Sequence, residues 1–197
     1  MLAYLLWHRP GEGVDAHSYE HATAAFHRSL AHSPPAGFLA SAAYRAPQLP
    51  WPDDADASSG DWYEDWYLVE DFAALGVLNQ AAVGRGHRTP HDEVARRMGR
   101  AAGGLYGLLE GTVELARKRV AVWVARPPRA NAPTFADLLG DGMDPRRAGL
   151  LRRSLVLSPA PEYCVLADEA PAGVAPTRLA QGWSATALQR VAIDECA

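Results

Sequence analysis

Residues 60–71, GDWYEDWYLVED, decide the fold of this chain. Four aromatic residues fall inside six positions and are flanked by acidic residues: Trp62, Tyr63, Trp66 and Tyr67. Aromatic residues are enriched in strands, and the preceding segment, 47–60, has the prolines, Asp and Ser of an exposed loop. The stretch therefore predicts a strand over residues 61–70.

Side chains alternate along a strand, so this strand would present two different faces. One face would hold Trp62, Glu64, Trp66, Leu68 and Glu70, and the other Tyr63, Asp65, Tyr67 and Val69. The second face is a candidate pocket wall for a small aromatic or polyketide-like molecule, with Asp65 as a base or an orienting group, although we favour a structural role. The alternative is structural, because aromatic pairs stabilise sheets and acids on edge strands oppose aggregation.

The flanking segments supply partners for this strand. Residues 2–8 form a short apolar run ended by Pro10, which is typical of a buried strand. Residues 15–31 carry apolar side chains at helical spacing, and residues 37–45 alternate enough for a second strand. Residues 72–83 again have helical spacing, so the first half predicts the order βαββα.

Residues 89–111 are predicted to form a glycine-rich helix. Its first residues, Thr89, Pro90 and Asp92, match the preferences of the N-cap, N1 and N3 positions. Glycine recurs every four positions, at Gly99, Gly103 and Gly107. Each glycine in a helix costs about 1 kcal/mol relative to alanine, so we expect a close approach there, by another backbone or by a ligand.

The second half repeats features of the first. Residues 27–38, HRSLAHSPPAGF, align without gaps with residues 152–163, RRSLVLSPAPEY. Residues 5–10, LLWHRP, match WVARPP, and residues 184–195 take the place of the aromatic stretch. The repeat predicts a first βαββα unit at 1–88, a connecting helix at 89–116 and a second βαββ unit at 117–197.

Two consecutive βαββ units in a short chain resemble the ferredoxin-like, dimeric α/β-barrel superfamily. In that superfamily two antiparallel sheets close a barrel, either across a dimer or within one duplicated chain. The group includes small monooxygenases, isomerases of the muconolactone type and haem-dependent relatives of chlorite dismutase. The resemblance implies an α+β fold of two ferredoxin-like units, with a homodimer as one way to close the barrel.

Composition excludes several classes of function. The net charge of −4, from 19 basic and 23 acidic residues, argues against nucleic acid as the main partner. The two cysteines, Cys164 and Cys196, form neither a disulfide framework nor a metal motif, which fits a reducing cytoplasm. The apolar run near the N-terminus is too short for a signal peptide or a membrane span. We therefore expect a cytoplasmic protein without a membrane partner.

The candidate catalytic residues are Asp65, His8, which ends the first strand, and His91, which lies at a helix start beside Asp92. The candidate substrate-binding residues are Tyr63, Tyr67, Trp66 and Tyr106. No histidine stands in a haem-binding context, and no nucleotide-binding or serine-hydrolase motif is present, so no cofactor is expected.

Three hypotheses for the function remain open. The first is a cofactor-free enzyme that oxygenates or isomerises a small molecule, with a pocket between sheet and helices. The second is a non-catalytic ligand-binding or protein-interaction module. The third is a metal-dependent enzyme on His17 and His21, which share a helix face but have no evident third ligand, so no metal is expected. Convergence of Tyr63, Asp65 and Tyr67 with His8 on one cavity would favour the first.

Overall fold

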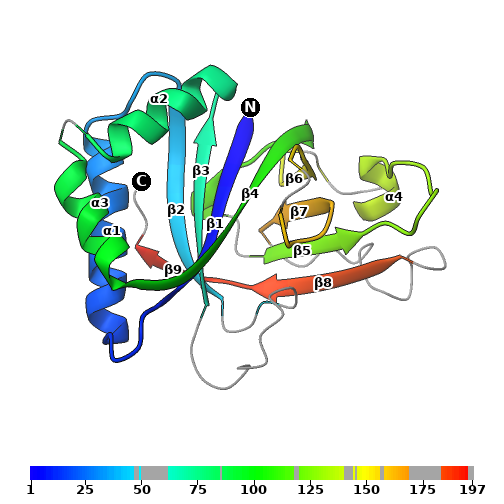
Figure 1. The fold of residues 1–197 in the computed structure, drawn as a ribbon. Coiled ribbons are helices and arrows are strands. Elements are labelled where there is room, and N and C mark those ends of the chain that lie inside the picture. Colours follow the sequence, from blue (N-terminus) through cyan, green and yellow to red (C-terminus); the bar gives the residue numbers. More distant parts are fainter. Residues whose placement is uncertain are drawn as a thin grey trace.

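The computed structural model describes residues 1–46, 49, 62–84, 86–117, 120–139, 144, 146–155, 158–168 and 183–194. Over these residues the strands form one nine-stranded sheet, and helices cover its first half (Figure 1). The first-half elements are β1 (Leu2–Pro10), α1 (Ala16–His32), β2 (Phe38–Ala46), β3 (Trp62–Val69), α2 (Phe72–Ala82), α3 (Arg88–Arg97) and β4 (Met98–Gly111). A 3-10 turn η1 (Leu115–Arg117) precedes β5 (Val120–Ala125), α4 (Phe135–Leu139), β6 (Ala148–Arg153), β7 (Tyr163–Ala167), β8 (Ser184–Gln189) and β9 (Val191–Asp194).

The sheet curves into a nearly closed barrel. Its strand order is β8-β5-β7-β6-β4-β1-β3-β2-β9, and every neighbouring pair is antiparallel. The two strands at the ends of this order, β8 and β9, are consecutive in the chain, with Arg190 between them. A continuous piece of chain therefore pairs with β5 on one side and with β2 on the other, which draws the two ends of the sheet together (Figure 1).

Both halves of the sheet have the same arrangement of strands. In β4-β1-β3-β2 and in β8-β5-β7-β6, the first strand lies between the fourth and the third. The first run carries the helices α1, α2 and α3, whereas in the described part of the second half only the five-residue α4 is helical. The division into two ferredoxin-like units and its boundaries stay predictions.

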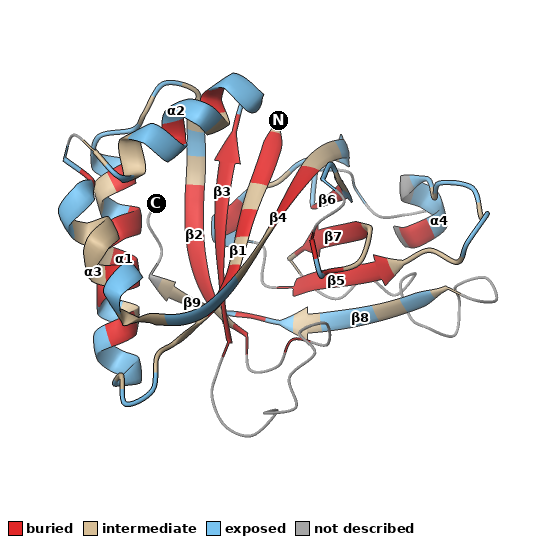
Figure 2. Ribbon diagram, in the orientation of Figure 1, coloured by how far each residue is buried: buried red, intermediate tan, exposed pale blue. Residues whose placement is uncertain are grey.

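The alternation predicted for the aromatic stretch is confirmed. All eight residues of β3 are buried (Figure 2). Trp62, Trp66 and Leu68 belong to a core cluster that joins both halves of the chain and fills the barrel. Tyr63, Tyr67 and Val69 belong to a second cluster with side chains of α1 and α2. The aromatic stretch therefore forms a strand that is buried on both faces.

A buried ion pair links β3 to the segment that closes the barrel. Glu64 Oε2 lies 3.5 Å from a guanidinium nitrogen of Arg190, and both side chains are fully buried. Glu64 Oε1 accepts a 2.9 Å hydrogen bond from the Trp7 indole N–H. The Arg190 guanidinium also lies over the Tyr44 ring, 4.0 Å from its centroid. These contacts hold the junction between β8 and β9 inside the barrel.

The predicted elements before residue 84 form within a few residues of their expected bounds. Side-chain caps explain the helix starts: Asp15 accepts a hydrogen bond from the Ser18 backbone N–H, and Asp71 accepts one from the Ala74 backbone N–H. The predicted loop 47–60 lies outside the described residues except for Leu49, as do Gly60 and Asp61 of the aromatic stretch.

The prediction of a helix over residues 89–111 is wrong for most of that range. Helix α3 ends at Arg97, and Met98–Gly111 forms strand β4, which pairs with β1 and β6. Glycine disfavours a helix. Without β4, the backbone N–H and C=O groups along one edge of β1 would be unpaired, and β4 provides their hydrogen-bond partners. The expected close backbone approach does occur at Gly99, where a Cβ would lie 2.8 Å from the Gly11 Cα.

The alignment of the sequence repeat is also wrong in detail. Residues 27–32 are helical in α1, whereas the matched residues 152–153 end strand β6. Residues 184–194 form β8 and β9, which do not occupy the sheet position that β3 has in its own half. Ser-Pro pairs are common stop signals, so their recurrence does not identify equivalent elements.

None of the helices in the described ranges combines the length and the apolar character needed to cross a bilayer. The cytoplasmic location stays a prediction.

The packing of β4 predicts opposite effects at two adjacent glycines. A Cβ at Gly104 would lie 2.9 Å from the Trp7 ring and 2.7 Å from Ser158 Oγ, inside the filled barrel. A Cβ at Gly103 would meet only ordinary contacts of 3.5 Å or more. We expect Gly104→Ala to lower the free energy of unfolding by about 1–3 kcal/mol through overpacking. Gly103→Ala should be neutral or stabilising by about 0.4–1 kcal/mol. Urea unfolding of both variants tests this, and equal stabilities would contradict it.

Candidate functional site

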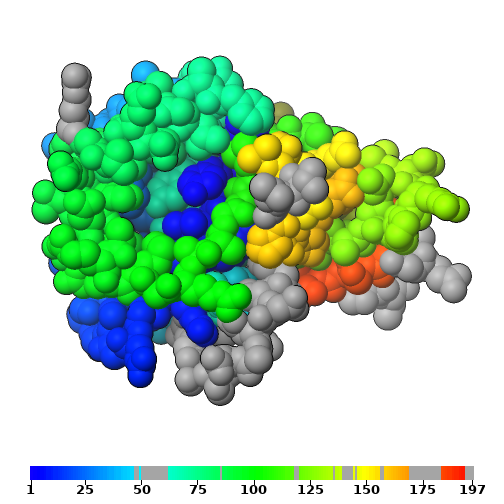
Figure 3. All heavy atoms as spheres, in the orientation of Figure 1, coloured from blue at the N-terminus to red at the C-terminus, as the bar shows by residue number. Residues whose placement is uncertain are grey.

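A cavity of about 520 Å³ lies between the first-half sheet and the helices. Its polar lining comes from β1, β3, α2 and α3: Tyr4, Asp65, Tyr67, Asn79 and His91. Its apolar lining is mainly Phe26, Phe72, Leu75, Leu78, Val94 and Met98. The space-filling view shows a hollow in this face, with the dark blue of β1 visible at its floor between the helices and β4 (Figure 3).

Helix α2 leaves room for this cavity. Only Ala74 and Leu78 of its eleven residues are buried. Beneath it, Tyr4 and Leu6 stay half-buried although β1 is a central strand of the sheet. A glycine, Gly76, stands on the cavity side of α2 and adds no side chain to it. Helix α2 therefore lies over this face of the sheet without packing closely against it, and the cavity occupies the space between them.

Asp65 is the centre of a buried polar cluster at the cavity wall. The Nε2 atoms of His8 and His27 lie 3.1 Å and 3.3 Å from Asp65 Oδ1. The Tyr67 hydroxyl donates a 3.0 Å hydrogen bond to Asp65 Oδ2. All of these side chains are almost completely buried. Neither imidazole is aligned for a straight hydrogen bond to Oδ1, so these two contacts are mainly electrostatic.

The outer nitrogen of each imidazole contacts a hydroxyl group. His8 Nδ1 lies 2.6 Å from the Tyr19 hydroxyl, and His27 Nδ1 lies 2.8 Å from Ser41 Oγ. One protonation pattern suits every contact: each hydroxyl donates to Nδ1, and each Nε2–H faces the carboxylate.

The pKa of Asp65 is held well below its usual range. Burial by itself would raise this pKa, but the electrostatic effects of His8 and then of His27 lower it more. Asp65 is thus an anion at neutral pH and a weak proton acceptor.

The tyrosines around Asp65 keep their protons. Burial first, and then the negative charge of Asp65, raise the pKa of Tyr67 well above its usual value. The same two causes raise the pKa of Tyr4 and of Tyr19. These phenols therefore act as hydrogen-bond donors at neutral pH.

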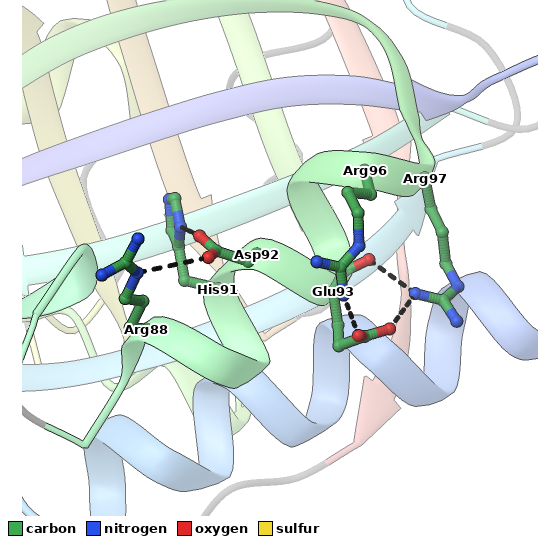
Figure 4. A network of polar contacts seen from close by, with 6 residues as sticks. All are labelled: Arg88, His91, Asp92, Glu93, Arg96 and Arg97. Carbon is green, nitrogen blue, oxygen red and sulfur yellow. Dashed lines mark hydrogen bonds and ion pairs between the residues drawn. The ribbon is translucent and has the colours of Figure 1, made fainter.

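His91 lies on the helical side of the cavity. Its Nδ1 is 3.1 Å from Asp92 Oδ1, and Arg88 Nε is 3.6 Å from Asp92 Oδ2. Figure 4 shows the His91 ring extending from α3 toward the strands, with Asp92 and Arg88 beside it. The hydrogen bond with His91 is the main cause that lowers the pKa of Asp92. A carboxylate at Nδ1 favours the tautomer with a proton there, which leaves Nε2 as the basic nitrogen.

The structure brings five of the seven predicted residues to the cavity or its wall and separates the other two; His91 lines the cavity from α3. Asp65 and Tyr67 line the cavity, whereas His8 and Tyr63 lie behind the wall, with their rings stacked at 5.8 Å. The Tyr63 hydroxyl donates to Glu20 Oε1 at 3.1 Å, away from Asp65.

Trp66 and Tyr106 do not belong to this group. Both are in the barrel core, and the Tyr106 hydroxyl donates to the Pro161 carbonyl oxygen at 3.0 Å. Trp66 is on the face of β3 opposite to Tyr67, as alternation requires. Tyr106 was placed on a helix by the sequence pattern, but it lies on β4 and points into the barrel. Neither residue lines the cavity, so the expectation that they share one pocket with Tyr67 is corrected.

Sequence reasoning missed several residues of the site: Tyr4, Tyr19, His27 and Asn79. Tyr4 could have been found, because residues 4 and 8 lie on the same face of a strand, so Tyr4 and His8 share a face of β1. His27 follows Phe26 on the buried side of α1, a position that a helical count alone leaves ambiguous.

No group of three metal-ligating side chains is found in the part of the chain that the structure describes. His17 and His21 are exposed on α1. His8 lies beside Tyr63, and the His27 ring stacks on Tyr67 at 5.0 Å. The two imidazoles therefore approach Asp65 from opposite directions along β3 instead of enclosing one point.

No family model and no curated protein matches this chain significantly. Solved structures do match over nearly the whole length. A candidate monooxygenase from Lactobacillus acidophilus aligns with a TM-score of 0.56 and 10% identity, over 96% of this chain and 93% of its own. A candidate chlorite dismutase aligns with a TM-score of 0.53 and 13% identity, over 98% and 95%. An anthrone oxidase-like protein aligns with a TM-score of 0.50 and 11% identity, over 98% and 94%.

The chain shares its fold with these three structures over nearly its whole length, which is consistent with the dimeric α/β-barrel fold. Identities this low establish the fold alone. The α+β class and the nearly closed antiparallel sheet expected from the resemblance are confirmed at that level. A dimer is not shown, and neither is a function for any residue.

The buried charge of Asp65 predicts a pH-dependent stability. The pKa of Asp65 is lower in the folded state than its ordinary value of 3.8. The ionised carboxyl therefore stabilises the fold at pH values above 3.8, and this contribution is lost progressively as the pH falls below 3.8. We expect Asp65→Asn to lower the free energy of unfolding by about 3–5 kcal/mol at pH 7.

The difference in the free energy of unfolding between the wild type and Asp65→Asn should narrow by about 1.4 kcal/mol for each pH unit below 3.8. Urea unfolding between pH 7 and pH 2.5 measures it, with Glu12→Gln, an exposed acid, as control. A difference that does not vary with pH would show that Asp65 is not ionised in the folded state.

Proposed function

We propose that this protein is an enzyme of the oxygenase or isomerase type that acts on a small aromatic compound without a bound cofactor. One observation carries the proposal: an aromatic-lined cavity has an ionised, buried carboxylate in one wall and a histidine with a fixed tautomer in the opposite wall. Two titratable groups whose surroundings fix their protonation in different ways, as for Asp65 and His91 here, are typical of acid–base catalysis.

His91 is the better candidate for the base. A general base works best when its pKa lies near the working pH, and Asp65 is far more acidic than that. Asp92 holds the His91 Nδ1 proton, so Nε2 can accept a proton from the substrate. Asp65 instead positions Tyr67, His8 and His27.

The phenol of Tyr4 would receive the substrate oxygen, and the Tyr67 ring would pack beside it, because the single hydroxyl proton of Tyr67 is donated to Asp65 Oδ2. The two rings are stacked with centroids 6.0 Å apart, and both line the cavity. Removal of a proton next to a carbonyl group leaves an enolate, and a protonated phenol can donate a hydrogen bond to its oxygen. This assigns binding to the tyrosines and proton transfer to His91.

Two outcomes follow from the same enolate. In an isomerase, His91 returns the proton to another carbon of the substrate. In an oxygenase, the enolate transfers electrons to dissolved dioxygen. A CH₂ group becomes a carbonyl group, one oxygen atom enters the product, and the other leaves as water with the two hydrogens. Dioxygen is the only oxidant that this step requires.

The fold supports this proposal in general terms, because the neighbours are named for a monooxygenase, an anthrone oxidase and a chlorite dismutase. The alternative is a ligand-binding or interaction module without chemistry. The buried cluster favours the enzyme, since a binding module has no need for the cost of burying Asp65 beside two histidines.

The chain itself would supply both sheets of the barrel, as the proposed units 1–88 and 117–197. The equal strand order in both halves supports this, as does the pairing of β9 with β2. A homodimer is then not required to close the barrel, although it remains compatible with the fold. No nucleic acid or membrane partner is proposed.

Turnover of an aromatic CH-acid tests the function. Anthrone is a suitable probe, with oxygen uptake measured by an electrode and the product identified by mass spectrometry. We expect His91→Gln to lower kcat by about 10²–10⁴-fold through loss of the base. Asp92→Asn should shift the pH profile of kcat/KM, because it removes the anion that holds the His91 tautomer.

Glu93→Gln is the matched control, since Glu93 lies on the same helix and contacts Arg96 and Arg97 (Figure 4). It should leave turnover unchanged. Binding of aromatic probes by the wild type without consumption of any of them, with or without dioxygen, would support the binding module instead.

A further inference from the structure

We infer that the cavity selects uncharged or cationic aromatic compounds with a hydrogen-bond donor and excludes carboxylates, and that Asp65 sets this selection. The inference rests on the proposed use of the cavity for a substrate. It goes beyond that proposal by naming the charge and the polar group of the ligand.

The lining supplies a negative charge and no matching cation. Asp65 is 2% exposed and its carboxylate faces the cavity. None of the described lining residues is a lysine or an arginine. An anionic ligand would therefore be desolvated beside a like charge in a low-dielectric site, without the permanent positive charge of a lysine or an arginine to pair with.

The donors near Asp65 are already committed to it. The Tyr67 hydroxyl donates to Oδ2, and the Nε2 atoms of His8 and His27 face Oδ1. A carboxylate has more acceptor positions than these contacts use. Because Oδ1 is fully enclosed by protein atoms, the remaining acceptor position of Oδ2 is the one that the wall can offer to a ligand hydroxyl or amide N–H, and it offers an anion little in return.

The shape of the lining favours flat rings. Tyr4 and Tyr67 are stacked with an interplanar angle of 27°, and Phe26 continues this wall with its ring 6.2 Å from Tyr67. The His91 ring meets Phe26 edge to face at 5.5 Å. An aromatic ligand can pack against these faces and edges, which gives geometric selection in addition to apolar burial.

Two isosteric probes separate charge from shape: 2-naphthamide, which is neutral, and 2-naphthoate, which is an anion at pH 7.5. Titration calorimetry on the wild-type protein should give an affinity for the amide at least about tenfold higher, a difference of about 1.4 kcal/mol. The cation 2-naphthylmethylammonium should bind at least as tightly as the amide. Naphthoate binding that equals or exceeds amide binding would overturn the inference, as would failure of all three probes to bind.

The variant Asp65→Asn should reduce the preference for the amide over the acid, whereas Glu12→Gln, which removes the same charge from the surface, should keep it. An unchanged preference in folded Asp65→Asn would overturn the role of Asp65. If circular dichroism shows that Asp65→Asn does not fold, the cation and anion probes on the wild type decide the question.

This result is independent of catalysis. Selective binding of neutral probes without turnover would contradict only the proposed enzyme function. Turnover of a compound through its bound carboxylate would contradict only the selection by charge.

Discussion

Strand β3 carries two adjacent carboxylates, Glu64 and Asp65, and buries both. Alternation sends them to opposite faces of the sheet, so each needs its own partners in its own layer. Inside the barrel, Glu64 contacts Arg190 and Trp7, and this ties the junction of β8 and β9 to the centre of the first half. On the helical side, Asp65 gathers two imidazoles and a phenol. The closure of the barrel and the candidate site thus depend on neighbouring residues of one strand.

The two faces differ in how completely they are filled. The barrel side packs the rings of Trp7, Trp66 and Trp123 closely, with Trp7 and Trp123 centroids 5.5 Å apart, and Gly104 has no space for a methyl group. The helical side stays open because α2 contributes only Ala74 and Leu78 to the core. A ligand site therefore forms on one face only. On the outer face of the second half, a packed cluster of Val122, Leu150 and Val165 lacks comparable polar groups among the residues described.

Polar groups in the site form a connected arrangement rather than a set of separate residues. Asp65 is stabilised as an anion, the tyrosines as phenols, and His91 as one tautomer by Asp92. Asp65 depends on partners from β1 and α1, whereas Tyr67 and Asp65 share β3, and His91 and Asp92 share α3. The chemistry proposed for the cavity needs these states to coexist: a donor for an oxyanion, a base on the other wall, and a fixed negative charge that biases the choice of ligand.

The sequence by itself determined β3, its two faces and the helix that begins after Asp15. These features follow from local preferences and from strand alternation, which neighbours in sequence encode. It could not place β4, because a glycine-rich segment has weak intrinsic preference and becomes a strand only beside the free edge of β1. It also could not join His27, Tyr19 and Tyr4 to Asp65 or place Trp66 and Tyr106 in the barrel. The contacts of Asp65 depend on how α1 crosses the sheet, and the barrel positions depend on where β8 and β9 close it. Both are contacts between residues far apart in sequence, so only the tertiary structure decides them.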